Sequence, residues 1–319
     1  MARLTEDAPA RKRLKPSALQ RGDTVGIIAP ASNIKRDALL AGCQGLQRIG
    51  YKPFYFDSIL EQDLYFAGSL ERRTRELHDM FERDDIRAIV CARGGYGCNY
   101  LVPGIDLEAI QRHPKIFIGY SDVTTLLTLL CDAASMTVFH GPMSAKDFVD
   151  EDGVDVASWE AALSGAASWD ITDSGARGLR NGHAEGVFYG GCLPMLAATL
   201  GTSHEIQTAG RILFLEDIGS KPYQIDRMLM QLKLAGKFES VRGIIFGEMN
   251  DCVQHPQQGY TLEEVVLRIV GDLNIPVAFG LRSGHVTRRN ITLPIGIQAS
   301  LDVTEAQVQL KFLESATTA

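Results

Sequence analysis

The sequence predicts an α/β protein of two domains, a doubly wound, mostly parallel sheet followed by a smaller mixed α/β unit. A chain of 319 residues is longer than one hydrophobic core usually serves. From residue 22 to about 143, short apolar runs alternate with helix-like stretches, as in a parallel sheet covered by helices on both faces. The next 40 or so residues are polar, small and acidic. We therefore expect an N-terminal domain over residues 14–150, a connection over 151–184 and a C-terminal domain over 185–313.

The first domain is predicted to alternate strands with helices. The run 86–92 (IRAIVCA) is almost continuously apolar, which is typical of a strand buried on both faces. The first helix has apolar residues at helical spacing and closes on Gly50, because glycine is the usual residue just past a helix end. The predicted strands are 23–30, 52–56, 86–92, 115–120 and 136–142, and the predicted helices are 38–50, 72–85 and 121–130.

The second domain is predicted to mix strands and helices without an internal repeat. The connection before it is predicted to hold only one short helical patch. The strand-like runs of the second domain are 211–217, 241–249, 275–281 and 290–303, and its helix-like runs are 191–201, 223–236 and 261–270.

Charge and cysteine usage exclude several classes of function. Lys plus Arg number 32 and Asp plus Glu number 39, so the net charge is −7, which argues against nucleic acid or an anionic membrane as partner. No run approaches the ~20 apolar residues of a membrane span, and no secretory signal is visible. The six cysteines are scattered without a CxxC pair. This pattern indicates a reduced, cytoplasmic protein without disulfides or a zinc site.

The segment KIFIGYSDVTTLL places Ser121 between a predicted strand and a predicted helix. Taken alone, a serine at this position most often caps the helix. The functional alternative is a sharp strand–turn–helix elbow that exposes the serine oxygen above the sheet edge as a nucleophile. Gly119 allows a tight approach, but Val123 stands where the second glycine of G-x-S-x-G would be.

A glycine-rich turn, RGGYG, follows the strand 86–92. Gly94, Gly95 and Gly97 permit positive φ and close approach of the backbone to a ligand. Such a turn can cradle a phosphate, although it matches neither G-x-G-x-x-G nor the Walker motif. It can equally offer N–H groups to a carbonyl oxygen or a carboxylate. In an open α/β sheet, this turn and the Ser121 turn both lie where ligands bind.

An acid and a base follow in the second domain. Glu216 ends an apolar strand, and a carboxylate there could orient an imidazole; the alternative is an acidic residue favoured by a helix dipole. His285 lies in a loop between two strand-like runs, with His140 as its only rival. Ser121, Glu216 and His285 thus occur in the order nucleophile, acid, base, which is common among α/β hydrolases. The predicted site lies between the two domains.

These motifs together resemble the LD-carboxypeptidase family of serine peptidases. The resemblance is carried by RGGYG, IGYSDVT, FHGPM, LFLEDIG with YQIDRML, and GHVTRRNITLPIG, and it covers essentially residues 14–311. It implies an N-terminal domain like that of class I glutamine amidotransferases and a β-barrel-like C-terminal domain. It also implies cleavage of an amide before a C-terminal D-amino acid, releasing D-alanine from murein tetrapeptides during cytoplasmic cell-wall recycling.

The resemblance assigns roles to individual residues. It implies Ser121 as nucleophile, His285 as base and Glu216 as orienting acid. The N–H of Asp122 and one N–H of the RGGYG turn, from Gly94 or Gly95, would form the oxyanion hole. No metal or cofactor is implied, and a homodimer is suggested. The substrate-binding candidates, on sequence proximity, are Arg93, Tyr96, Arg282 and Arg288.

Two alternatives for the substrate stay open. Some family members are self-immunity hydrolases that cleave microcin-C-type peptidyl nucleotides and use an aromatic residue to stack on the base; the two tryptophans here are Trp159 and Trp169. Cys192 also stands where the family segment GGNL has asparagine, which is a departure from the family pattern. The rival from another class is a non-hydrolytic, Rossmann-like protein that binds phosphate or nucleotide through GGYG.

Overall fold

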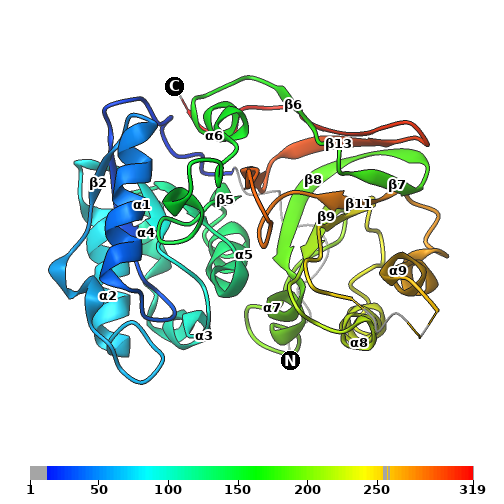
Figure 1. The fold of residues 1–319 in the computed structure, drawn as a ribbon, viewed down its shortest axis with the longest axis horizontal. Coiled ribbons are helices and arrows are strands. Elements are labelled where there is room, and N and C mark those ends of the chain that lie inside the picture. The colour runs from blue at the N-terminus through cyan, green and yellow to red at the C-terminus, as the bar shows by residue number, and fades with distance from the viewer. Residues whose placement is uncertain (1–12, 254–256, 258, 319) are drawn as a thin grey trace.

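The chain folds into two β-sheets that lie side by side (Figure 1). The computed structural model describes residues 13–253, 257 and 259–318. Over these residues one sheet has six strands and the other has eight. The predicted α/β class with two units is therefore confirmed. No helix in these described ranges combines the length and the apolar character needed to cross a bilayer.

The first sheet is parallel except for one edge strand. Its strands are β1 (Thr24–Ile28), β2 (Lys52–Phe54), β3 (Ile86–Cys91), β4 (Ile116–Gly119), β5 (Val138–His140) and β12 (Leu293–Ile295). Their order is β12-β5-β4-β3-β1-β2, and β12 pairs antiparallel with β5. Because β3, β4 and β5 run parallel, the turns that follow them lie at one edge of the sheet.

Three helices of the first unit match predicted helices, and two short helices between residues 98 and 112 were not predicted. The helices of this unit are α1 (Arg36–Arg48), α2 (Leu70–Glu82), α3 (Cys98–Leu101), α4 (Leu107–Arg112) and α5 (Thr124–Asp132). Helix α2 begins two residues earlier than its hydrophobic pattern predicted, because the hydroxyl of Ser69 caps it by accepting the N–H of Arg72 at 3.2 Å.

The second sheet is curved and has a parallel centre with antiparallel flanks (Figure 1). Its order is β6-β14-β13-β8-β9-β10-β11-β7. The strands are β6 (Trp169–Thr172), β7 (Arg177–Arg180), β8 (Gly182–Cys192), β9 (Arg211–Glu216), β10 (Gly243–Gly247), β11 (Val277–Leu281), β13 (Gln298–Val303) and β14 (Val308–Phe312). The helices are α6 (Val156–Leu163), α7 (Leu193–Ala198), α8 (Pro222–Leu234) and α9 (Leu262–Val270).

Several segments differ from the pattern that the sequence predicts. Two strands of the second sheet, β8 and β14, were not predicted. The expected connection, 151–184, contains α6 and the two edge strands β6 and β7. The run 290–303 splits into β12, which joins the first sheet, and β13, which joins the second. Edge strands lack the continuous apolar pattern of buried strands, and a single run cannot reveal which sheet each half joins. The domain boundaries stay a prediction.

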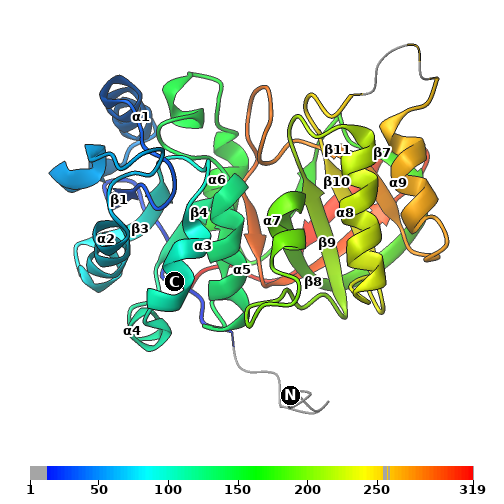
Figure 2. The same ribbon diagram turned by 90° about the horizontal axis from the view of Figure 1, so that it is seen from below.

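Helix α5 lies between the two sheets and contacts both α7 and β8 (Figures 1 and 2). Asp132, its last residue, accepts a hydrogen bond from the hydroxyl of Tyr189 at 2.6 Å and pairs with the guanidinium of Arg211 at 2.7 Å. Both partners belong to the second sheet. Ser121 lies on the turn just before α5, so this helix links the serine to the junction between the two units.

Candidate active site

Ser121 occupies a strained turn between β4 and α5. Its φ of 63° lies in the left-handed region, which costs a residue with a side chain roughly 1 kcal/mol or more. The serine is not a helix cap, because neither the turn Ser121–Val123 nor α5 has a side-chain cap. Ser121 is half-buried, whereas its neighbours Tyr120 and Asp122 are buried. A strained, accessible serine at a strand end has the geometry of a nucleophile elbow.

The RGGYG turn packs directly against this serine. A Cβ added to Gly94 would lie 2.7 Å from the Cβ of Ser121 and 3.2 Å from the backbone nitrogen of Asp122. Gly95 has a φ of 103°, and a Cβ there would lie 2.3 Å from the Oγ of Ser32. Only glycine fits at both positions. Among the described residues, the N–H groups of Gly94 and Gly95 donate to no acceptor.

The side chain of Asp122 anchors the serine turn. Its Oδ2 accepts the backbone N–H of Cys98, at the start of α3, at 2.8 Å. Burial raises the pKa of this carboxyl despite that hydrogen bond. Asp122 therefore ties the serine turn to the helix that follows RGGYG, which holds the two predicted oxyanion elements together.

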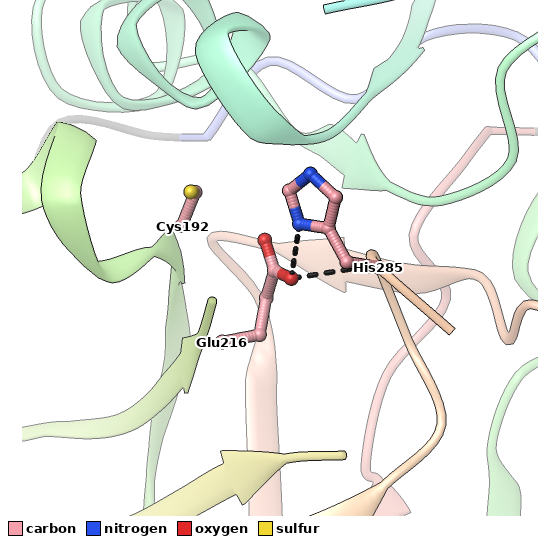
Figure 3. A group of neighbouring side chains, drawn as sticks. All are labelled: Cys192, Glu216 and His285. Carbon is pink, nitrogen blue, oxygen red and sulfur yellow. Dashed lines mark hydrogen bonds and ion pairs between the residues drawn. The ribbon is translucent and has the colours of Figure 1, made fainter. Parts of the chain in front are cut away.

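Glu216 and His285 form a hydrogen-bonded pair (Figure 3). Oε2 of Glu216 accepts from Nδ1 of His285 at 2.8 Å and from the backbone N–H of His285 at 3.0 Å. Glu216 is only 1% exposed. Burial alone would raise the pKa of its carboxyl, but the hydrogen bonds from His285 and the electrostatic attraction of the two neighbouring imidazole rings outweigh burial and hold the pKa well below its usual range. The carboxylate is therefore an anion at neutral pH.

Two glycines allow these elements to meet. Glu216 is the last residue of β9, and His285 lies on the loop after β11. A Cβ on Gly284 would lie 2.6 Å from Cδ of Glu216, and one on Gly247 would lie 2.7 Å from Cβ of Glu216. The backbone can approach the carboxylate this closely only because neither residue has a side chain.

His140 faces the other oxygen of Glu216. Its Nε2 lies 3.8 Å from Oε1, and neither atom has a hydrogen-bond partner among the described residues. Its Nδ1 lies 2.9 Å from the hydroxyl of Ser283, which donates its one proton to the carbonyl of Ile291 at 2.8 Å. The hydroxyl must therefore accept from Nδ1–H, so Nε2 faces the carboxylate and donates to it only when the ring is cationic.

The ring of Tyr120 brings the two halves of the site into contact. It meets the ring of His285 edge-on, with centroids 5.0 Å apart, and it directly precedes Ser121. In Figure 3, the ring nitrogen of His285 that faces away from Glu216 points toward the ribbon of the first unit. The predicted acid and base thus lie against the residue that precedes the predicted serine, at the junction between the two sheets.

Some of the predicted substrate-binding side chains are exposed, and one is held in an ion pair. Arg93 and Tyr96 are exposed beside the glycine turn, and Arg93 donates to the carbonyl of Asn33 at 3.2 Å. Arg282 is engaged elsewhere, because its Nε pairs with Asp173 at 2.9 Å. Arg288 is exposed on the His285 loop. Their roles in binding stay predictions.

Sequence reasoning missed three contributors to the site. Ser283 sets the orientation of His140. Asp147 is buried, and its carboxylate accepts the hydroxyl of Tyr120 at 3.4 Å and the N–H of Met143 at 2.8 Å. Burial raises the pKa of this carboxyl to about 6. Ser32 accepts the N–H of Tyr96 at 3.1 Å and supports the glycine turn. No local motif marks these residues, since each acts through a partner at least several positions away.

The chain matches known proteins along both units. A family model described as the LD-carboxypeptidase N-terminal domain matches residues 25–141, and one described as the LD-carboxypeptidase C-terminal domain matches residues 185–301. The chain is 38% identical over 296 residues to the probable murein peptide carboxypeptidase of Bacillus subtilis, covering 91% of this chain and 92% of that protein. It is 27% identical to the microcin C7 self-immunity protein MccF of Escherichia coli, covering 93% and 95%.

A solved structure has the same overall fold. The muramoyltetrapeptide carboxypeptidase from Oxalobacter formigenes superimposes with a TM-score of 0.83 at 28% identity, covering 92% of this chain and all of that one. At this coverage the superposition includes most of both sheets.

Proposed function

Because the chain belongs to the LD-carboxypeptidase family, we propose that it is a serine carboxypeptidase that cleaves the amide before a C-terminal D-amino acid. Its substrate in this proposal is a murein tetrapeptide, from which it releases D-alanine during cell-wall recycling in the cytoplasm. The proposal includes a homodimer and no nucleic-acid partner.

One observation carries the proposal. His285 is hydrogen-bonded to a buried carboxylate and lies against the residue that precedes a strained, accessible serine. A serine hydroxyl is a weak nucleophile until a base removes its proton, and the base needs an orienting acid. Phosphate or nucleotide binding alone would not require this pairing.

The proposed reaction has two halves, formation of an acyl-enzyme and its hydrolysis, and Ser121, His285 and Glu216 act in both. Glu216 accepts Nδ1–H of His285, which leaves Nε2 unprotonated and able to take the proton of Ser121. The serine oxygen attacks the scissile carbonyl, and Nε2–H then protonates the leaving D-amino acid. In the second half, His285 takes a proton from water as the water attacks the acyl-enzyme, and it then returns that proton to the oxygen of Ser121.

The oxyanion of the tetrahedral intermediate would be held by backbone donors. The N–H of Asp122 and the N–H of Gly94 or Gly95 are the candidates, because Gly94 packs against both Ser121 and the Asp122 nitrogen. Losing one such donor typically lowers kcat by about 10²–10³. Arg93 and Tyr96, exposed beside the same turn, are candidates for recognising the substrate carboxylate.

Hydrolysis of a peptidyl nucleotide is the second candidate, because MccF also matches nearly the whole chain. Stacking on a base requires an accessible aromatic ring. Trp159 is fully buried against Tyr51 and Phe148, and Trp169 packs on Phe312. Trp169 is only partly buried, and Tyr96 is exposed beside the glycine turn, so the accessibility of aromatic rings does not separate the two substrates. The higher identity to the murein peptide carboxypeptidase favours the tetrapeptide.

The deciding experiment offers both substrates to the same protein. We expect release of D-alanine from a murein tetrapeptide and little turnover of an aminoacyl sulfamoyl adenylate. Ser121→Ala should lower kcat by several orders of magnitude while leaving the fold intact. If Ser121→Ala keeps near-wild-type turnover, the mechanism is wrong. Preferential turnover of the adenylate would instead support the second candidate, and binding of nucleotide without any hydrolysis would support the Rossmann-like alternative.

A further inference from the structure

Cys192 lies beside the acid and the base. It ends β8, and its sulfur, one carboxylate oxygen of Glu216 and one ring nitrogen of His285 all lie within 4.8 Å of one another (Figure 3). The thiol and the carboxylate are buried, and His285 is partly buried. None of the other cysteines belongs to such a group among the residues that the structure describes.

The three side chains suit a thiophilic cation. Thiolate sulfur, imidazole nitrogen and carboxylate oxygen are the ligands that zinc takes in proteins. Oε1 of Glu216 is buried without a hydrogen-bond partner among the described residues, so one ligand position is already free. A dication with one thiolate and one carboxylate is neutral overall, which reduces the cost of placing it in a buried site.

We propose that Cys192, Glu216 and His285 form an inhibitory site for Zn²⁺ or a similar thiophilic metal. The metal is not a resident cofactor of hydrolysis; it competes with the arrangement that hydrolysis needs. This proposal departs from the expectation, drawn from the scattered cysteines, that the protein has no zinc site. That expectation considered spacing along the chain, whereas this group comes from three distant segments.

The geometry requires a small adjustment. Zinc–ligand distances of about 2.0–2.3 Å in a tetrahedral site place the ligand atoms roughly 3.3–3.8 Å apart. Atoms within 4.8 Å of one another reach that spacing by modest side-chain rotation. Nδ1 of His285 is the ring nitrogen on the side of Cys192 and Glu216 in Figure 3. The fourth metal position is left for water.

Metal binding at Nδ1 would stop the proposed hydrolysis through the tautomer of His285. Nδ1 must give up its proton to bind the metal, and a neutral ring then carries the proton on Nε2. An Nε2–H cannot accept the proton of Ser121. The thiol of Cys192 loses its proton to solvent as the Zn–S bond forms, so one proton leaves the protein for each zinc bound.

The test measures zinc binding and inhibition separately. Calorimetry of the tag-free chain with ZnCl₂, in buffers of different ionisation enthalpy, should give one site and one released proton. Cys192→Ser should weaken this binding by about a hundredfold or more, and Ser121→Ala should not change it. Co²⁺ should give a thiolate charge-transfer band in the wild type and none in Cys192→Ser.

Inhibition is read as hydrolysis of the tetrapeptide, relative to each variant's own zinc-free rate. Zinc should inhibit the wild type, and Cys192→Asn and Cys192→Ser should need about a hundredfold more zinc. Cys43→Ser and His183→Ala are matched controls for an unrelated thiol and for the surface cluster of His183 with Asp302. Equal inhibition of wild type and Cys192 variants, or loss of the site in His183→Ala, would overturn the proposal.

The measurements of metal binding do not depend on the proposed hydrolysis. If no substrate is hydrolysed, calorimetry and the Co²⁺ spectrum still decide whether the site exists. If hydrolysis occurs but the wild type binds no zinc at Cys192, only the metal site fails.

Discussion

At the scale of single residues, the buried carboxylate of Glu216 is the centre of the site. One oxygen accepts twice from His285, and the other faces His140 at 3.8 Å. His140 is itself oriented by Ser283. We therefore expect His140 to be a positioning residue, which acts on the serine only through Glu216 and His285.

Substitution of His140 tests this role. His140→Asn can keep the donor to Ser283 but loses the nitrogen that faces Glu216, whereas His140→Gln keeps a polar group near the carboxylate. We expect kcat to fall roughly tenfold to a hundredfold in His140→Asn, with KM little changed, and to be partly restored in His140→Gln. Steady-state kinetics decide the point: equal losses in both variants would indicate a merely structural role.

Asp147 should make the stability of the protein depend on pH. Burial raises the pKa of its carboxyl from 3.8 to about 6. Between these values the folded chain holds a proton that the unfolded chain has lost, so stability falls as pH rises from about 4 to 6 and this loss is complete above about 6. The two-unit difference corresponds to about 3 kcal/mol.

Asp147→Asn removes this titration. We expect its free energy of unfolding to exceed that of the wild type by up to about 3 kcal/mol at pH 7.5, with the difference disappearing near pH 4. Urea unfolding at several pH values measures it. The exposed Asp150→Asn is the matched control and should show no such pH-dependent gain. A constant difference at all pH values would contradict the account.

At the scale of elements, close backbone contacts determine how helix α1 packs against the segment 144–148, which follows β5. Helix α1 contains Gly42 and Gly45, which face the segment 144–148. A Cβ on Gly42 would lie 2.0 Å from the carbonyl oxygen of Ser144, and one on Gly45 would lie 2.0 Å from that of Phe148. These glycines therefore serve packing, although the helix pattern alone makes them look like weak positions.

Gly45→Ala tests whether this glycine is needed for packing or is only a weak position in the helix. In an isolated helix, alanine is more favourable than glycine by about 0.5–1 kcal/mol. Here the added methyl would meet backbone atoms that cannot rotate away, so we expect a loss of about 1–3 kcal/mol. Urea unfolding with an unchanged m-value measures the loss. Gln44→Ala, on the exposed side of α1, should change stability by less than about 0.5 kcal/mol; stabilisation by Gly45→Ala would refute the packing argument.

At the scale of the whole molecule, the site exists only because two sheets meet. Ser121 belongs to the first unit, and Glu216 and His285 belong to the second. The links between them include β12, which returns from the second half of the chain to pair with β5, and Asp132 with its partners Tyr189 and Arg211.

Asp132→Ala should weaken both stability and catalysis. The guanidinium of Arg211 is mostly buried and would lose its charged partner, which typically costs about 3–5 kcal/mol. Since α5 carries Ser121 at one end and Asp132 at the other, kcat should fall as well. Thermal unfolding and kinetics measure the two effects. Asp272→Ala, which breaks the exposed pair with Lys233, should cost less than about 1 kcal/mol and leave kcat unchanged.

The strongest predictions from sequence concern segments whose signal is local. Buried parallel strands such as β3 and β4 are runs of apolar residues, and the helices between them repeat with a period of 3.6 residues. The candidate serine, acid and base could be selected because each follows or flanks such a run. Short edge strands, such as β6 and β7, carry no comparable pattern and appeared only in the structure.

The sequence by itself therefore determined the α/β class, the succession of strands and longer helices along the first unit, the family and the identity of the candidate residues. Only the tertiary structure decided that Ser121 is a strained elbow rather than a cap, that Glu216 lies between two histidines, and that Cys192 adjoins them. The physical reason is the distance along the chain between the atoms that interact. Strand and helix patterns arise from neighbours along the chain, whereas backbone strain, buried charge and metal-ligand geometry arise from atoms that meet only when the two sheets pack together.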